Sequence, residues 1–333
     1  MLLYILKRVA QGVAVVIGVM MVIFFIIRVI PGDPARMIAG PSSTPERIAE
    51  IHKGLGLDKP IVVQFLHYLV RVVKGDLGQS IFRAKGGGTT TGRHIHSASD
   101  TGRTGIEDFE KAAVMDLILE RLPLTLMLTG MAVLIAILTA GFLGILSAVK
   151  HDTMWDRIVT LISIVTQAAP NFWVGIVFIL IVAVHLKLIP AMGYKNFAYV
   201  ILPAFTLSLS MIPTWLRIIR LGLIDVLSKS FISGLKARGI RWDVILFKHA
   251  LRSAAIPFVT VLSVHMGYLL GGAIIVEFVF DFPGLGLLTI VSVLQRDFTV
   301  VQGIVIFFAS IFVLINILMD VLYVYLDPRI SLE

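Results

Sequence analysis

An all-α membrane protein with six spans is the fold class that this sequence predicts, on three observations. Of its 333 residues, 57% are hydrophobic, against roughly 45–50% in soluble domains. Long apolar runs recur along the chain, and about 20 apolar residues in a helix cross the roughly 30 Å hydrocarbon layer. Basic residues gather at the ends of those runs. The predicted spans are residues 9–30, 122–149, 158–186, 199–219, 256–276 and 300–323.

The loop charges predict the orientation of these spans. Lys and Arg crowd the segment before the first span, the loop between the second and third, and the loop between the fourth and fifth. These residues are Lys7, Arg8, Lys150, Arg157, Arg217, Arg220, Lys229, Lys236, Arg238, Arg241, Lys248 and Arg252. Positive charge in short loops marks the cytoplasmic side. We therefore expect both termini in the cytoplasm.

The spans divide the chain into three regions. Residues 1–30 form the N-terminal cytoplasmic end and the first span, which is too long for a signal-peptide core and lacks a small-residue cleavage site. Residues 31–121 form an external segment, in which the pattern at 62–70 predicts one or two short amphipathic helices. Within it, residues 83–105 are rich in Gly, Thr and His and predict a flexible loop. Residues 122–333 form a five-helix core.

Composition excludes several kinds of site. The net charge of +8 is concentrated at span ends, so we expect no nucleic-acid partner. No cysteine is present, which excludes disulfides and thiolate metal ligands. The Gly spacing at 87–94 resembles a phosphate-binding loop, but Arg93 and His94 replace the required Lys and hydroxyl. His94, His96 and Asp100 suggest metal capture or, since a third fixed ligand is lacking, a solvated linker; we assign no metal site.

The segment between Asp225 and Pro257 is the most informative part of the chain. Apolar residues recur there at spacings near three and four, with basic residues over the remaining surface. Gly239 interrupts the pattern, and a glycine in a helical run favours a break or tight turn. We predict two short amphipathic helices within residues 225–255 that meet near Gly239 and project from the membrane. The alternative is a solvated basic loop that only sets the topology.

This segment resembles the signature of bacterial ABC importer permeases. KARGI at 236–240 matches the Ala-x-Gly core of that signature, and KHALRSAAIP at 248–257 matches its trailing part. Further stretches are similar to the dipeptide, oligopeptide and nickel subfamily. They are IPGDP at 30–34, LGLDKP at 55–60, GDLGQS at 75–80, ERLP at 120–123, EFVFDFPGLG at 277–286, RD at 296–297 and DPR at 327–329.

The resemblance implies a type I ABC importer permease in the bacterial inner membrane. Its expected partners are a second homologous permease subunit, two ABC ATPase subunits and an external solute-binding protein. The chain itself is expected to be no enzyme and to hold no cofactor, with ATP and Mg on the ATPase subunits. The residues implied in ATPase docking are Phe231, Leu235, Lys236, Ala237, Arg238, Gly239, Ile240, Arg241 and Trp242. Ser230, Phe231 and Leu235 depart from the usual signature, so an acid-mediated contact is not carried over.

Polar residues within the predicted spans form a second candidate site. Gln167, Asn171, Ser208 and His265 lie at a depth where polar groups face a cavity or another helix. They either line the solute path or bond neighbouring helices. Gln167 and Asn171 flank Pro170, which predicts a local break in that span.

The outer turn after the fifth predicted span is a third candidate. Its residues are Glu277, Asp281, Phe282, Pro283 and Gly284, placed to form a gate, to receive a solute-binding protein, or to serve only as a rigid turn.

Three functions remain open at this point. Import of di- or oligopeptides is the first expectation, with nickel or another small solute such as a glutathione-like compound as the alternative within the family. An ion-coupled secondary transporter is the second, although no inverted repeat or mid-span acid supports it. A membrane sensor or assembly factor is the third, with the basic segment binding a regulator.

Overall fold

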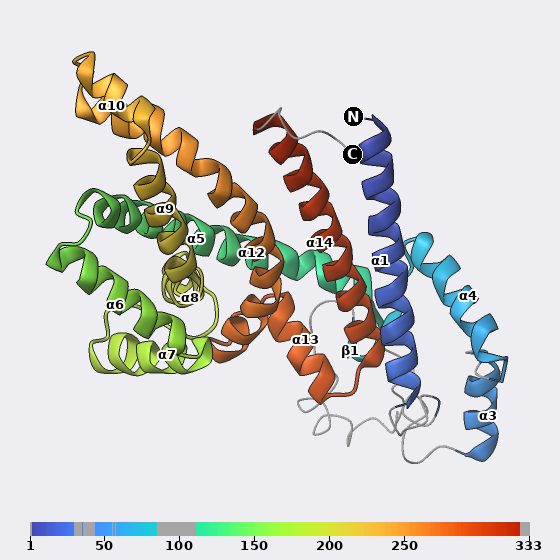
Figure 1. The fold of residues 1–333 in the computed structure, drawn as a ribbon. Coiled ribbons are helices and arrows are strands. Elements are labelled where there is room, and N and C mark those ends of the chain that lie inside the picture. The colour runs from blue at the N-terminus through green and yellow to red at the C-terminus, as the bar shows by residue number, and fades with distance from the viewer. Residues whose placement is uncertain are drawn as a thin grey trace. The chain divides into compact units, whose positions relative to one another are not determined.

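The computed structural model describes residues 2–29, 35, 44–54, 56, 58–84 and 111–326, and Figure 1 shows the helices that they form. The chain divides into two compact units. The first unit comprises residues 1–8, 122–288 and 314–333, and the second comprises residues 9–121 and 289–313. The predicted loop at 83–105 lies outside the described residues from position 85 onward.

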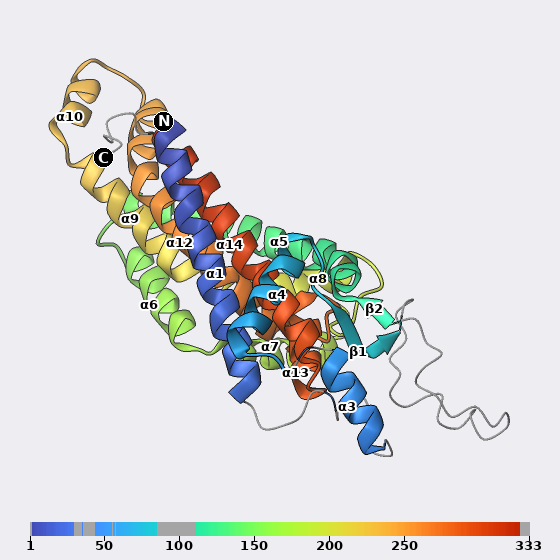
Figure 2. The same cartoon turned by 90° about the vertical axis from the view of Figure 1, so that its right-hand side faces the viewer.

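The first unit is built from helices joined by short loops. They are α5 (Val114–Val149), α6 (Met154–Ala168), α7 (Asn171–Phe178) with a π-helical continuation (Ile179–His185), α8 (Ala198–Ser208), α9 (Ile212–Leu227), α10 (Ser230–Ala237), α11 (Trp242–Val244) with a π-helical turn (Ile245–Ala250), and α12 (Leu251–Val279). Figure 2 shows α9 leading into α10 and the chain returning through α12. The first eight residues of α5 belong to the second unit.

Close helix approaches hold the first unit together. Its core includes the fully buried Trp215 of α9 together with Leu207 and Val276 from neighbouring helices. A Cβ on Gly144 would lie 3.0 Å from Ile219, and a Cβ on Gly175 would lie 3.1 Å from the Phe280 ring. Small residues let membrane helices pack this closely, because lipid provides no hydrophobic force between them.

The second unit combines helices with a small sheet. It contains most of α1 (Leu2–Val29), α3 (Pro45–Gly54), α4 (Ile61–Val73), the strands β1 (Gln79–Ala84) and β2 (Lys111–Ala113), and parts of α13 (Leu285–Leu294) and α14 (Phe298–Leu326). The strands pair antiparallel, with Gln79 opposite Ala113 and Ala84 opposite Lys111. Ser80 donates a 2.5 Å hydrogen bond to the buried Asp297 before α14, which ties the sheet to that helix.

Several helices of the described chain qualify as membrane spans. Three are long and apolar enough by themselves: residues 6–29, 114–149 and 298–320. The number rises to five when each of two bent pairs, α6 with α7 and α8 with α9, counts as one span. The chain bends by 102° between α6 and α7, where Pro170 precedes the first residue of α7. The predicted break at Pro170 is confirmed.

Candidate functional site

The bend at Gly239 has a specific backbone cause. Helix α10 ends in a Schellman motif, in which the amide of Gly239 donates to the carbonyl of Lys236 at 3.0 Å and the amide of Ile240 donates to that of Leu235 at 3.3 Å. Gly239 has a φ of +73°, the left-handed conformation that this motif requires and that glycine adopts without a steric cost. The predicted break at Gly239 is confirmed.

The second half of the predicted helix pair differs from expectation. Residues 242–279 run as α11, a π-helical turn and α12 without interruption, so the segment after Gly239 is the start of one long helix rather than a separate short one. We call residues 228–247 the elbow. The continuity means that the elbow is joined directly to a helix of the first unit.

The apolar residues of the elbow fall into two groups. Leu235 and Ile240 are partly buried and pack against the core of the first unit, and Ile232 is 1% exposed. Phe231 and Trp242 point outward, with 44% and 43% of their surface exposed. Leu235 and Ile240 therefore anchor the elbow to its own bundle, whereas the two aromatic side chains are available to a partner.

Sequence reasoning overlooked Phe247 as part of this surface. Its side chain is 60% exposed, and it follows Trp242 by five residues and lies within the π-helical turn. Phe247 belongs to the apolar pattern between Asp225 and Pro257, and that pattern alone assigns it no outward role. Its outward direction depends on the π-helical register, which periodicity alone does not reveal.

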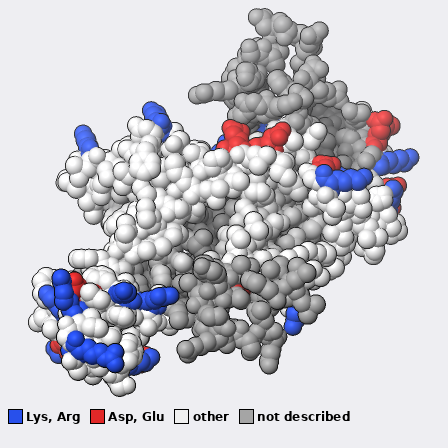
Figure 3. All heavy atoms as spheres, turned by 90° about the horizontal axis from the view of Figure 1, so that it is seen from above, with Lys and Arg blue, Asp and Glu red and all other residues white. Residues whose placement is uncertain are grey.

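The basic residues of the elbow surround these aromatic side chains. Lys236 Nζ lies 4.9 Å from the centre of the Trp242 ring in a cation–π contact, and Arg241 pairs with Asp243 at 2.9 Å. Ala237 and Arg238 are exposed. Figure 3 shows Lys and Arg side chains clustered at the lower left, where α10 lies. An apolar centre with a basic rim is the surface type that protein partners bind.

An ion pair between Arg220 of α9 and Asp156 of α6 holds the helix that leads into the elbow. Arg220 donates from Nε and Nη2 to the two carboxylate oxygens of Asp156, at 2.7 Å each. Ser147 also donates to Asp156, and Asp156 is 3% exposed. The pair links α9 to the end of α5 and the start of α6, and sequence reasoning did not identify it.

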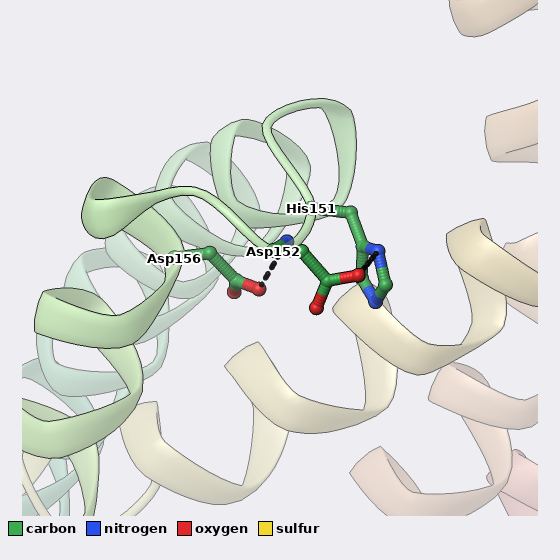
Figure 4. A group of neighbouring side chains, drawn as sticks. All are labelled: His151, Asp152 and Asp156. Atoms are coloured by element: carbon green, nitrogen blue, oxygen red, sulfur yellow. Dashed lines mark hydrogen bonds and ion pairs between the residues drawn. The ribbon is translucent and has the colours of Figure 1, made fainter.

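A group of possible metal ligands lies at the same loop. His151, Asp152 and Asp156 bring one ligand atom each within 4.8 Å of one another, and Figure 4 shows His151 turned toward Asp152 while the Asp156 carboxylate is held from the Asp152 backbone. The Arg220 guanidinium already neutralises Asp156. The ion pair accounts for this carboxylate without a metal.

Three of the four predicted pathway residues line one cavity of the first unit. The cavity has a volume of about 890 Å³, and Gln167, Asn171 and His265 are among its lining residues. Ser208 is not; it is fully buried and its hydroxyl donates to the carbonyl of Phe205 at 2.7 Å. Ser210 of the same segment lines the cavity instead.

Two of the cavity residues are held by neighbours from α9. Trp215 donates from Nε1 to Nδ1 of His265 at 2.8 Å, so a neutral His265 carries its proton on Nε2. The Gln167 side-chain carbonyl accepts a 3.3 Å hydrogen bond from Arg217. The helix that enters the elbow therefore also contacts two polar groups of the cavity.

The outer turn is ordered by a buried carboxylate. Glu277 is fully buried, accepts a 2.7 Å hydrogen bond from Thr125 Oγ1, and accepts from the amides of Gly286 at 2.6 Å and Leu287 at 3.2 Å. A negative charge at the first amides of α13 is favoured by unpaired donors and by the helix dipole.

Close packing at this turn leaves no room for a side chain at Gly284 or Gly286. A Cβ on Gly284 would lie 2.4 Å from the Glu277 carboxyl, and one on Gly286 would lie 2.4 Å from the Ile274 Cα. Phe282 is fully buried and meets the Tyr194 ring edge-on at 5.6 Å, while Pro283 is partly buried. Asp281, with a φ of +48°, is exposed. Of the predicted gate residues, Asp281 is the one that is open to solvent.

Comparison with known proteins identifies the family. Residues 140–332 match the family described as "Binding-protein-dependent transport system inner membrane component", and residues 1–129 match "Binding-prot-dependent transport system membrane comp, N-term". The chain belongs to this family. It is a multi-pass inner-membrane permease component of a binding-protein-dependent ABC importer, and it is not itself catalytic.

Two curated relatives cover nearly the whole chain. The "Probable peptide ABC transporter permease protein y4tP" of Sinorhizobium fredii is 32% identical, with 98% of each chain covered. The "Glutathione transport system permease protein GsiC" of Salmonella typhimurium is 34% identical, with 99% of each chain covered.

A solved structure supports the fold. The structure titled "Inward facing conformations of the MetNI methionine ABC transporter" aligns with a TM-score of 0.55 at 18% identity, over 64% of this chain and 97% of that one. The ABC permease fold implied by the signature is therefore confirmed.

Proposed function

We propose that the chain is one of two permease subunits of a di- or oligopeptide importer, with six spans and both termini in the cytoplasm. Helix α12 contains the predicted span at 256–276 and supplies the sixth span beside the helices and bent pairs given above. A single bundle provides half of a central pathway. A second homologous permease completes the pathway, and two ATPase subunits supply the energy for transport.

The observation that carries the docking role is the elbow surface. Phe231, Trp242 and Phe247 are exposed aromatic side chains on a segment that continues into α12. Exposed aromatic residues that gather on one short segment favour a protein interaction surface there. An ATPase subunit that holds this rigid segment can transmit its closure to the bundle.

The docking role is tested by co-purification of the ATPase subunits with the permease. Phe231→Ala and Trp242→Ala should each weaken the assembly roughly 30-fold, because buried aromatic residues at interface centres contribute about 2 kcal/mol or more. Trp155→Ala is the matched control, since Trp155 is an even more exposed aromatic residue that lies outside the elbow. Unchanged assembly in both elbow variants would contradict ATPase docking at this surface.

The cavity lined by Gln167, Asn171 and His265 is proposed as part of the solute path. A peptide carries backbone donors and acceptors, and side-chain amides and an imidazole complement both. The nickel alternative has less support, because the one cluster of ligand-type side chains among the described residues does not line this cavity.

Import of a glutathione-like solute is the second candidate. It is favoured by the name of a relative that is 34% identical over 99% of this chain. Uptake by cells that express the whole system, with labelled tripeptides, labelled glutathione and nickel as separate substrates, distinguishes the candidates. Uptake should stop when ATP is depleted and persist with an uncoupler; the reverse result would indicate an ion-coupled transporter.

A further inference from the structure

A basic cavity in the second unit is not explained by solute transport. It has a volume of about 700 Å³ and lies among the end of α1, the α3–α4 turn, α4 and one residue of α14. Its lining includes four cations, Arg28, Lys53, Lys59 and Arg71, together with Tyr68 and Gln302. No acidic side chain is among the described residues that line it, so the cavity favours an anion.

Two buried polar groups in this cavity have no partner within the described chain. They are the Tyr68 hydroxyl and the Gln302 side-chain amide nitrogen, and Tyr68 is 7% exposed. Burial raises the pKa of the Tyr68 hydroxyl, against the opposing effect of Arg71 and Arg28, so it remains a protonated donor at neutral pH. Buried donors are nearly always hydrogen-bonded in folded proteins, which indicates that an acceptor group belongs here.

The Arg28 guanidinium, at one end of the cavity, is held in a fixed position by its neighbours. Arg28 donates from Nε and Nη2 to the Gln64 side-chain carbonyl at 3.1 and 2.7 Å, and its guanidinium carbon lies 3.6 Å from the centre of the Phe24 ring. The Gln64 amide in turn donates to the Lys59 carbonyl at 2.8 Å. A guanidinium held in this way retains further N–H donors for an anion.

An exposed apolar stripe borders the same cavity. Val62, Leu66, Val70 and Val73 of α4 are 63%, 54%, 54% and 86% exposed, at spacings that place them on one face of the helix. Leu66 and Val70 also line the cavity. The opposite face of α4 packs its Phe65 and Tyr68 against Phe24 of α1.

The position of Arg28 relates this cavity to the bilayer. Arg28 lies in the last turn of α1, at the end of a segment, residues 6–29, that is long and apolar enough to span. The cavity therefore lies at the level where phosphate groups of the bilayer are found, and α4 is amphipathic in the manner of helices that lie in that layer.

We propose that this cavity binds the headgroup of an anionic phospholipid. The phosphodiester accepts hydrogen bonds from Tyr68, Gln302 and the basic side chains, and one acyl chain lies along Leu66 and Val70. A free phosphate ion satisfies the donors but leaves the adjoining apolar stripe uncovered. With the termini in the cytoplasm, as proposed above, the lipid belongs to the outer leaflet.

Native mass spectrometry of the purified full chain tests this proposal. The chain is titrated with phosphatidylglycerol and, separately, with phosphatidylethanolamine of the same acyl composition. We expect tighter binding of phosphatidylglycerol, and a loss of about fivefold in its affinity for each cation removed in Lys59→Gln and Arg71→Gln. Tyr68→Phe keeps the ring packing and should lower the affinity severalfold through the lost hydrogen bond.

Lys74→Gln is the matched control, because Lys74 follows α4 directly and does not line the cavity; it should bind lipid as the unchanged chain does. Inorganic phosphate is the competitor that distinguishes the two phosphate sources. The proposal is overturned if phosphatidylglycerol has no advantage, if the Lys59→Gln/Arg71→Gln double variant keeps it, or if inorganic phosphate displaces the lipid at micromolar concentration. It is equally overturned if these variants weaken only the association with an acidic solute-binding protein.

Discussion

Arg220 of α9 and Asp156 of α6 form a bidentate ion pair, with both nitrogen–oxygen distances at 2.7 Å. The side chains are 19% and 5% exposed, so water screens the pair weakly. Because α9 leads into the elbow, this pair fixes one of the two helices, α9 and α12, that join the elbow to the first unit.

Removing the carboxylate should destabilise the protein strongly. Asp156→Asn leaves the Arg220 charge without its partner, and breaking a buried pair on one side costs about 3–5 kcal/mol. The exposed pair of Lys229 and Asp225, at 52% and 69% exposure, provides the control, since Asp225→Asn should cost less than about 1 kcal/mol. Thermal unfolding in detergent measures both. Equal midpoints for the two variants would show that the Asp156 pair is no more important than a surface contact.

The conformation of the elbow should depend on the positive φ of Gly239 rather than on the absence of a side chain at this position. No atom lies within 4 Å of a Cβ built on Gly239, yet its φ is +73°, so Gly239→Ala should cost about 1–2 kcal/mol from conformation alone. Gly234→Ala, in the helical part of α10 with equally open surroundings, should be neutral or stabilising by up to about 1 kcal/mol. Hydrogen exchange of the Gly239 and Ile240 amides reports the difference; a similar exchange rate in both variants would count against the Schellman motif.

The outer turn should tolerate no side chain at Gly286. A Cβ there would meet the Ile274 backbone at 2.4 Å, and overpacking of this kind costs about 1–3 kcal/mol or more. Gly130→Ala, with nothing within 4 Å, is the control and should not destabilise. The two variants are compared by thermal unfolding and by proteolysis of the turn, and a stable, protease-resistant Gly286→Ala chain would contradict the close approach.

The cavity residues should affect transport more than assembly. Asn171→Ala removes a polar group that lines the cavity, and the loss of one hydrogen bond of about 0.5–1.5 kcal/mol should slow uptake roughly two- to tenfold. Ser208→Ala is the contrasting variant, because Ser208 bonds its own helix away from the cavity. Uptake of a labelled peptide by the reconstituted complex is the measurement. Equal uptake by both variants would remove Asn171 from the path.

The features that sequence predicts here are those set by local backbone chemistry. Pro170 cannot supply an amide to a helix ladder, and Gly239 adopts a positive φ without strain, so both breaks follow from residue type. The signature around residues 236–257 likewise identifies the family without any tertiary information.

The features that sequence does not predict depend on helix rotation and on distant partners. Ser208 and Ser210 are two residues apart, and which of them lines the cavity depends on how α8 and the turn after it pack. Asp156 and Arg220 are 64 residues apart, and each alone resembles an ordinary charge near a span end. Glu277 alone also resembles an ordinary charge near a span end, because its hydrogen-bond partner Thr125 belongs to another helix.

The π-helical turn at Ile245–Ala250 sets the angular phase between the two ends of one long helix. An α-helix advances by about 100° per residue, and a π-helical turn accommodates one residue more than an α-helical turn does. Deleting a single residue within this turn would therefore swing Trp242 through about 100° around the axis while His265 kept its bond to Trp215. The direction of Trp242 at the elbow relative to His265 in the cavity is thus set by one extra residue.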